Sequence, residues 1–332
     1  MARFVGRLRK LGIGKEATAG TAVAPTFWVP LYDGNFQDKA EYKDNEGGYG
    51  NIAAISDTRI SKEWSDGDYS GKIQLTSVGL ELTALHGASP TSAQRTITGV
   101  YDHTYDMVLD SNDHKTLTVA VAEPNYSGRY AGIGIDSWSL DTELGDFIRR
   151  TVSLMGGASA SSSETAAYVD EQEFLTEHMS VRIAAEGAND ATIDAATAIK
   201  LTGFKLEVKK NAELQYEYGS RKPTGTSART IEITGEIEAY YDDRAWYTLA
   251  NNNTAQTMRI TIKNPDVIIG TSGSHNPELR FTLARVKFQL PERASDNNEL
   301  TKQTIPFKAS LSLANGKILT TRLTNDYAGT NY

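Results

Sequence analysis

Apolar and polar side chains alternate along residues 230–240, and this is the clearest pattern in the chain. Apolar residues occupy every second position there, and Glu or Thr residues lie between them. Because successive side chains of a strand point to opposite faces, the alternation predicts a half-buried β-strand. Directly afterwards, Asp242 or Asp243 can cap a short helix over residues 244–250. The pattern therefore predicts a strand followed by a helix.

The first half of the chain contains a weaker version of this unit. A strand is predicted over residues 69–75, and residues 78–86 have apolar side chains at helical spacing. Ser70-Gly71-Lys72-Ile73 aligns with Thr234-Gly235-Glu236-Ile237, so both strands carry a glycine at the same place. Two further pairs keep the same order: Trp138–Leu140 with Phe288–Leu290, and Ser153–Gly157 with Ser312–Gly316. We therefore predict a mostly β protein with short flanking helices, built from two tandem β-sandwich or barrel domains.

Composition along the chain suggests four segments. Residues 1–30 form a basic arm with an extended segment, 31–157 the first β domain, 158–166 a Ser/Ala-rich linker, and 167–332 the second β domain. Each β segment is long enough to bury its own core.

Other stretches predict further strands and loops. Glycines and prolines interrupt residues 12–31 too often for a helix, and Pro25 and Pro30 argue against a central strand, so we expect an extended surface segment. Turn residues at 111–113 predict a hairpin over residues 105–121. Further strands are predicted at 199–208, 213–218, 258–262, 280–290 and 305–313, the last with Leu311 and Leu313 facing inward.

Composition excludes several classes of protein. Of the 332 residues, 39% are hydrophobic and 23% charged, which is typical of a folded soluble protein. The chain has no cysteine, which removes disulfides, thiolate zinc sites and cysteine nucleophiles. No apolar run approaches the roughly 20 residues that span a bilayer, so membrane insertion is not expected. The net charge of −8 argues against tight binding of nucleic acid.

Basic residues gather at the start of the chain. Five of the 34 basic residues lie within residues 1–15, where there is no acid, so the remainder carries 29 basic and 42 acidic residues. The plainer interpretation is an extended arm that docks on an acidic neighbour, and a frayed terminus is the alternative. Trp64 and Tyr69 lie among charged residues, a pattern that favours an interface over a sugar site. The candidate subunit contacts are Arg3, Arg7, Arg9, Lys10, Trp64 and Tyr69.

Catalytic and metal-binding patterns are absent from the sequence. The five histidines are scattered without metal-ligand spacing, and we expect most of them at the surface or in turns. No Gly-x-Ser-x-Gly elbow occurs, and Asp170 with Glu171 would need a cleft to act as paired carboxylates. An enzyme is therefore not expected, and neither is a cofactor or a bound metal.

Several short motifs resemble one family of viral proteins. Gly12-Ile13-Gly14-Lys15-Glu16, with Thr18 and Gly20 to Pro25, resembles the opening of major tail tube proteins from long-tailed, non-contractile bacteriophages. Similar stretches follow at Ser137–Leu140, Leu154–Gly157 and Val208–Glu213. The resemblance implies a structural virion protein that is made in the host cytoplasm. Its subunits would stack as rings into the tail tube, together with tape measure and tail tip or terminator proteins, and the tube would carry DNA to the host.

The repeat and the charges make this expectation more specific. Three chains with two like domains each would close a ring with pseudo-sixfold symmetry, and rings of six chains are the second choice. A channel lined by carboxylates would repel phosphates, so DNA would slide through without binding. Alternation shows a polar face but not its direction, so a solvated outer face fits equally well. The candidate lumen-facing acids are Glu213, Glu217, Glu232, Glu236 and Glu238.

Two other functions fit the same composition. A carbohydrate-binding or adhesin-like pair of β-sandwiches would be monomeric and would use Trp28, Trp64, Trp138 or Trp246 as stacking platforms. A capsid decoration protein would also assemble, but on the surface of a shell.

Overall fold

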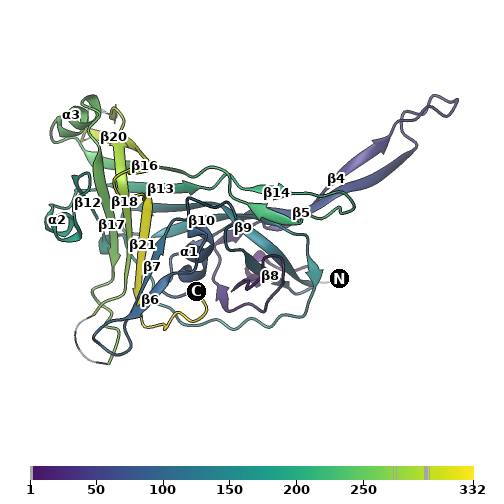
Figure 1. Ribbon diagram of the computed structural model, residues 1–332, viewed down its shortest axis with the longest axis horizontal. Coiled ribbons are helices and arrows are strands. Elements are labelled where there is room, and N and C mark those ends of the chain that lie inside the picture. Colours follow the sequence, from purple (N-terminus) through teal and green to yellow (C-terminus); the bar gives the residue numbers. More distant parts are fainter. Residues whose placement is uncertain (1–2, 272, 274, 295–297, 299) are drawn as a thin grey trace.

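The computed structural model describes residues 3–271, 273, 275–294, 298 and 300–332. Antiparallel strands dominate these residues, together with three short α-helices, so the prediction of a mostly β protein with short helices is confirmed (Figure 1). The helices are α1 (Val78–His86), α2 (Asp190–Ala195) and α3 (Ala245–Asn251). Single 3₁₀ turns occur at Gly6–Leu8 and Thr176–His178.

One long layer of paired strands runs through both halves of the chain. Its spatial order is β4 (Gln37–Asn45), β5 (Asp57–Lys72), β10 (Arg149–Gly156), β9 (Tyr126–Glu143), β13 (Gly203–Lys209), β16 (Glu232–Tyr240) and β20 (Lys302–Ala309). The pairing of β9 with β13 joins the two halves within this layer. Short β3 (Asp33–Gly34) and β19 (Glu292–Ala294) pair with β5 and β20.

A second set of strands covers the apolar face of this layer. In the first half these are β2 (Phe27–Val29), β1 (Lys10–Lys15) and β8 (Leu117–Glu123). In the second half they are β12 (Met179–Ala185), β17 (Gln256–Lys263), β18 (Glu278–Phe288) and β21 (Leu319–Asn325). β21 pairs with first-half strand β7 (Tyr101–Asp106), and β7 in turn pairs with β6 (Thr91–Gln94). The remaining short strands are β11 (Ala160–Ser161), β14 (Glu213–Gln215) and β15 (Gly225–Ser227).

The two halves share an order of strand pairing. In the first half β5 pairs with β10, β10 with β9, β9 with β8 and β8 with β1. In the second half β16 pairs with β20, β20 with β18, β18 with β17 and β17 with β12. Strands β9 and β18 each pass from one layer to the other, as corner strands do in packed sheets. The aligned glycines keep their places, with Gly71 opposite Arg150 and Gly235 opposite Phe307.

The strand-and-helix units of both halves are confirmed. In β16 the side chains of Ile233, Ile237 and Ala239 are buried, as the alternation predicts. Helix α3 follows it, and the side chain of Asp243 accepts a hydrogen bond from the N–H of Ala245 at 2.8 Å. Helix α1 covers residues 78–86, the predicted range.

The prediction of a surface segment at residues 12–31 is wrong for its strand-forming parts. β1 lies between β2 and β8, and Leu11 and Ile13 are fully buried. The glycines of this strand do not mark turns. A Cβ atom on Gly12 would lie 2.7 Å from Pro25 Cβ, and one on Gly14 would lie 2.6 Å from the carbonyl oxygen of Ala24. They are required because a neighbouring segment passes very close to the strand.

Three other strand predictions are also wrong. β7 and β8 do not form the hairpin predicted over residues 105–121, because β7 pairs with β6 and β21 instead. The strand predicted at 213–218 is reduced to the three residues of β14. β20 ends at Ala309, so Leu311 and Leu313 are 42% and 84% exposed and do not face inward.

Candidate functional site

The long layer has a polar face opposite the buried core. The strand registers place alternate residues of β5, β10, β9, β13, β16 and β20 on this face, opposite the buried core. Its acidic residues are Asp66, Asp68, Asp141, Glu143, Glu207, Glu232, Glu236 and Glu238, and its basic residues are Lys72, Arg149, Lys205, Lys209, Lys302 and Lys308. The face therefore carries both signs of charge, with two more acids than bases.

Opposite charges lie across from one another on neighbouring strands of this face. Glu236 of β16 pairs in register with Lys205 of β13, and Glu232 pairs with Lys209. Asp141 of β9 lies opposite Lys205. Cross-strand neighbours of opposite charge attract each other weakly, which lowers the negative potential of the β16 acids. The sequence pattern missed this neutralisation because it depends on strand register.

The predicted lumen-facing acids lie on two elements. Glu232, Glu236 and Glu238 lie together on β16. Glu213 and Glu217 lie beyond the end of β13, on the short β14–β15 hairpin, and Glu213 is 3.4 Å from the guanidinium of Arg229. That these five residues line a channel stays a prediction.

The two halves contribute different side chains to the polar face. On β13, β16 and β20 the face is dominated by Lys and Glu residues. On β5, β10 and β9 its centre consists of small hydroxyl side chains, contributed by Ser70, Ser137, Ser139, Thr151 and Ser153. The first-half part is thus smoother and less charged than the second-half part.

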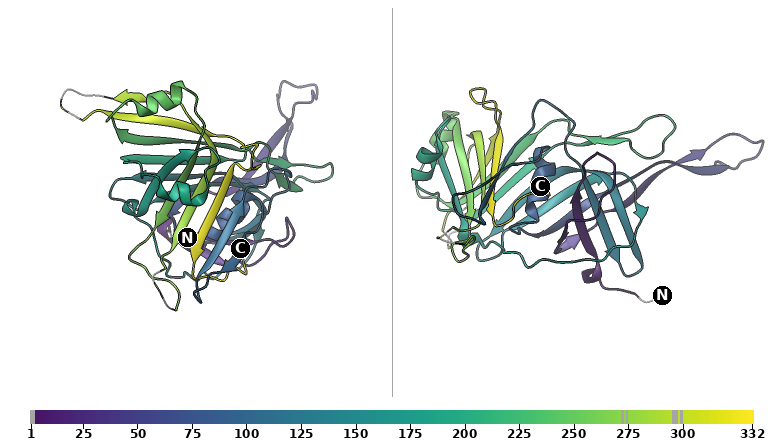
Figure 2. Two further views of the ribbon diagram at one scale, coloured as in Figure 1. Left: turned by 60° about the vertical axis from the view of Figure 1, so that its left-hand side comes forward. Right: turned by 60° about the horizontal axis from the view of Figure 1, so that its bottom comes forward.

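A long hairpin formed by β4 and β5 projects from the body of the protein (Figures 1 and 2). The glycine-rich segment Gly47–Gly50 lies at its tip, and the N–H of Ser56 donates to the carbonyl oxygen of Asn45 at 2.9 Å. A register shift between Glu41 and Tyr42 interrupts the pairing partway along the arm. Bulges of this kind increase the local twist of a ribbon.

The short β14–β15 hairpin braces the base of this arm. The ammonium of Lys62 lies 4.8 Å from the ring centre of Tyr216. The N–H of Glu63 donates to the carbonyl oxygen of Arg221 at 2.9 Å, and the side chains of the same two residues lie 3.9 Å apart. The second half therefore holds the arm of the first half in position.

The comparison with protein families settles what kind of protein carries these features. Residues 6–309 match the phage tail tube protein family. The chain belongs to this family. It is thus a structural subunit of a phage tail tube, it assembles with copies of itself, it is located in the virion tail, and it is not an enzyme. A comparison with curated proteins found no match.

Four of the predicted subunit contacts of this tail tube protein remain available at its surface. Arg3, Arg7 and Lys10 are exposed, and Trp64 is half-buried with its indole N–H donating to Asp66 at 2.8 Å.

The other two predicted contacts, Arg9 and Tyr69, are engaged within their own chain. Arg9 is tied into its own chain, because it donates to the carbonyl oxygen of Gly34 at 2.6 Å and lies 3.3 Å from the carboxylate of Glu123. Tyr69 is a core residue that is 1% exposed. Tyr69 occupies the inward position of its strand, and the charged residues before it belong to the outward face.

The prediction that most histidines lie at the surface or in turns is also wrong, because four of the five are buried. Burial, followed by the nearby charge of Lys210, lowers the pKa of His86 to about 3 and that of His114 to about 4. Burial likewise lowers the pKa of Lys210 to about 7, and its ammonium donates to the carbonyl oxygen of Ala84 at 2.7 Å. These groups lie where the C-terminal end of α1 meets the second half.

Binding features of other classes are not found among the residues that the structure describes. No helix there is long and apolar enough to cross a membrane. No group of three or more His, Cys, Asp or Glu side chains is arranged to hold a metal ion. Of the four tryptophans considered as sugar platforms, Trp28 and Trp138 are buried.

Proposed function

We propose that this tail tube protein builds the tube of a long-tailed phage with a non-contractile tail, in which stacked rings enclose a channel for viral DNA. Membership of the tail tube family carries the proposal. The motif at residues 12–25 supports the non-contractile type, because that is the group of tails it resembles. Assembly would take place in the host cytoplasm, with a tape measure protein inside the tube and terminator and tip proteins at its ends.

We propose further that the polar face of the long layer lines the channel. Its open edge supports this, because among the described residues β4 pairs only with β5 and so leaves one row of backbone groups free. Open strand edges are satisfied when neighbouring subunits continue a sheet into a closed barrel. A face with paired charges, a small acidic excess and hydroxyl groups gives phosphates no strong binding site, so DNA would slide.

The two halves are proposed to be tandem domains of residues 31–157 and 167–332, joined by residues 158–166. The shared order of strand pairing supports this, as does the matching position of Gly71 and Gly235. In a ring, two equivalent domains per chain would occupy six like places with three chains. Rings of six chains are the second choice.

The alternatives have less support. A sugar-binding module would need exposed aromatic platforms, and two of its four candidate tryptophans lie in the core. A capsid decoration protein does not fit the tail tube family.

Charge reversal on the polar face tests the channel. Replacing Glu207, Glu236 and Glu238 by Lys should leave tubes intact, because these side chains lie on the polar face and outside the core, and should slow DNA release at least tenfold, because the face would then bind phosphates. The matched control is Glu177→Lys with Asp266→Lys, two exposed acids outside the strands of this face, and it should leave release unchanged. Release is measured as DNA freed from receptor-triggered particles. Normal release from the triple variant would contradict the channel assignment.

A further inference from the structure

The tip of the long hairpin exposes apolar side chains at the end of a projecting arm. Tyr49 is 64% exposed, Ile52 fully exposed and Ile55 49% exposed. Among the described residues, the hydrogen bonds and ion pairs of residues 42–59 all join two parts of the hairpin itself. Fully burying one such side chain is worth about 1.5 to 3 kcal/mol, so this tip is a candidate contact surface.

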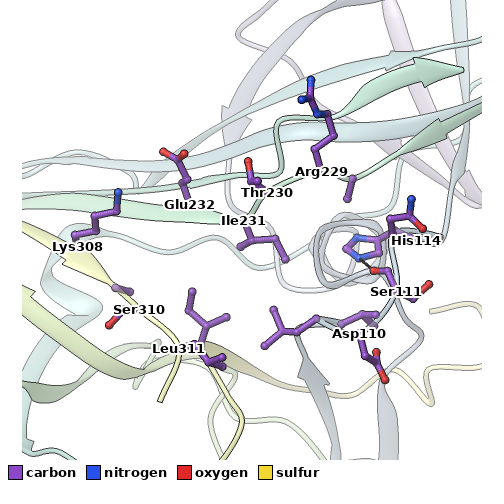
Figure 3. A pocket seen from close by; sticks show the side chains of 16 residues that line it. Asp110, Ser111, His114, Arg229, Thr230, Ile231, Glu232, Lys308, Ser310 and Leu311 are labelled. Atoms are coloured by element: carbon purple, nitrogen blue, oxygen red, sulfur yellow. Dashed lines mark hydrogen bonds between the residues drawn. The ribbon is translucent and has the colours of Figure 1, made fainter. Parts of the chain in front are cut away.

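A groove with both polar and apolar lining lies at the seam between the two halves. It has a volume of about 760 Å³ and is lined by residues 108–112 and 114 of the first half and by residues 228–232, 308–311 and 318 of the second. Leu109 and Leu311 are each 42% exposed there, so the groove offers apolar contact area to the tip. Ile231 and Leu311 point into it from opposite sides (Figure 3). The N–H of Ala228 donates to the carbonyl oxygen of Asn112 at 3.2 Å, which joins the two sides at one end.

Charge adds to this match. Glu46 is the one charged residue between positions 46 and 56. Lys308 stands at the rim of the groove, on the side of Ser310 (Figure 3). Neither Glu46 nor Lys308 forms an ion pair within the part of the chain that the structure describes. An acidic residue beside three apolar ones therefore has a counterpart in a basic residue at the rim of a groove with apolar lining at Ile231 and Leu311.

We propose that the tip of residues 46–56 in one copy of the chain docks into the seam groove of a second copy. The arm carries the tip away from its own body, so the tip cannot fill its own groove (Figures 1 and 2). The occupant is a copy of the same chain because tail tube proteins assemble with themselves. The contact joins two different surfaces, and such head-to-tail contacts extend into rings or open polymers. This inference rests on the proposed tube.

Because the chain has no cysteine, every disulfide crosslink must come from introduced cysteines. One preparation carries Ile52→Cys and another carries Leu311→Cys, both at exposed positions that should not disturb folding. The two are mixed in equal amounts, assembled and oxidised. We expect covalent dimers from the mixture and at least tenfold less dimer from either variant alone. A double variant with both cysteines should give a ladder of longer multimers.

Leu144→Cys provides the matched control, because Leu144 is 67% exposed and lies outside the groove. Mixed with Ile52→Cys, it should give no dimer. Ile55→Cys serves as a second tip position against Leu311→Cys. Tubes that form in both mixtures without groove crosslinks would overturn the docking inference and leave the proposed function standing. Failure of the unmodified chain to form tubes, with or without a tail initiation complex, would instead contradict the proposed function.

Discussion

The helix that follows the central strand is buried in one half of the molecule and peripheral in the other. All nine residues of α1 are buried, whereas α3 buries none. Both helices follow strands in equivalent positions of the pairing order, β5 and β16. The difference therefore arises from what covers each helix and not from the local strand-and-helix unit.

The second half supplies part of the cover for α1. Strand β21 pairs with β7 of the first half, and the chain then passes over α1. There the ring of Tyr332 lies so close to Gly79 that a Cβ atom on this glycine would be 2.4 Å from it. The hydroxyl of Tyr332 donates to the carbonyl oxygen of Thr76 at 2.7 Å. Burial of a helix can thus be decided by residues more than two hundred positions away.

The two halves also differ in the residue that lies opposite the aligned glycines, Gly71 and Gly235. This residue is Phe307 in the second half and Arg150 in the first. The guanidinium of Arg150 lies 2.6 Å from the carboxylate of Glu81 on α1, and both side chains are fully buried. Trp138 donates its indole N–H to the same carboxylate at 3.3 Å. An ion pair is therefore built into the first core where the second has an aromatic contact.

The largest expected effect comes from breaking this ion pair. Arg150→Met leaves the carboxylate of Glu81 buried without its partner, so we expect a loss of about 3 to 5 kcal/mol in the free energy of unfolding. The double variant Glu81→Leu with Arg150→Met makes the first core apolar like the second and should recover at least half of the loss. Urea unfolding measures both. A double variant as unstable as the single one would show that the pair is not the cause.

Replacing either aligned glycine by Ala should also lower the free energy of unfolding. A Cβ atom on Gly235 would lie 2.3 Å from both the carbonyl oxygen of Lys205 and the ring of Phe307, and one on Gly71 would lie 2.7 Å from the carbonyl oxygen of Pro30. Each substitution by Ala should lower the free energy of unfolding by about 1 to 3 kcal/mol, and Gly235→Ala should have the larger effect.

Gly48→Ala is the control for these two variants, because a Cβ atom there meets nothing within 4 Å. Thermal unfolding compares the three. If Gly71→Ala left the unfolding temperature unchanged, β5 and β16 would not be equivalent at this position.

Burial of α1 should also make the first half sensitive to acid. The pKa of His86 is about 3 in the folded chain because of burial and the nearby charge of Lys210, against an ordinary value of 6.5. Between these values the unfolded chain binds a proton that the folded chain does not, so stability falls as the pH drops from 6.5. One such group contributes a slope of about 1.4 kcal/mol per pH unit.

His86→Phe should remove this contribution, because among the described residues the ring nitrogens of His86 have no hydrogen-bond partner, and its ring makes an edge contact with Tyr105 that a phenyl ring can keep. The midpoint of urea unfolding, followed from pH 7 to pH 4, measures the slope. An unchanged slope in the variant would show that His86 is not responsible.

The sequence predicted what depends on local periodicity and missed what depends on distant segments. β16, α1 and α3 were predictable because alternation and helical spacing are local patterns. β1 was not, because Gly12 and Gly14 resemble loop residues until Pro25 and Ala24 are seen to pass beside them. The repeat shows the same limit. The sequence comparison matched Trp138 with Phe288, whereas the strand registers align Trp138 with Val286, two residues earlier.

The candidate site was predictable only in part. Alternation identified the glutamates of β16, but their basic neighbours Lys205 and Lys209 come from the register with β13. Residue type gave no indication that Tyr69 is buried or that Arg9 is held by its own chain. The seam groove could not be predicted, because it forms only when the two halves pack together.

Counting the chains in one ring tests the equivalence of the two halves most directly. Cryo-electron microscopy of assembled tubes, with end-on views sorted by symmetry, gives this number. The account predicts three 36.2-kDa chains per ring and six lobes of nearly equal size around the channel. A ring of six chains would contradict it, because the two halves would then not occupy equivalent places.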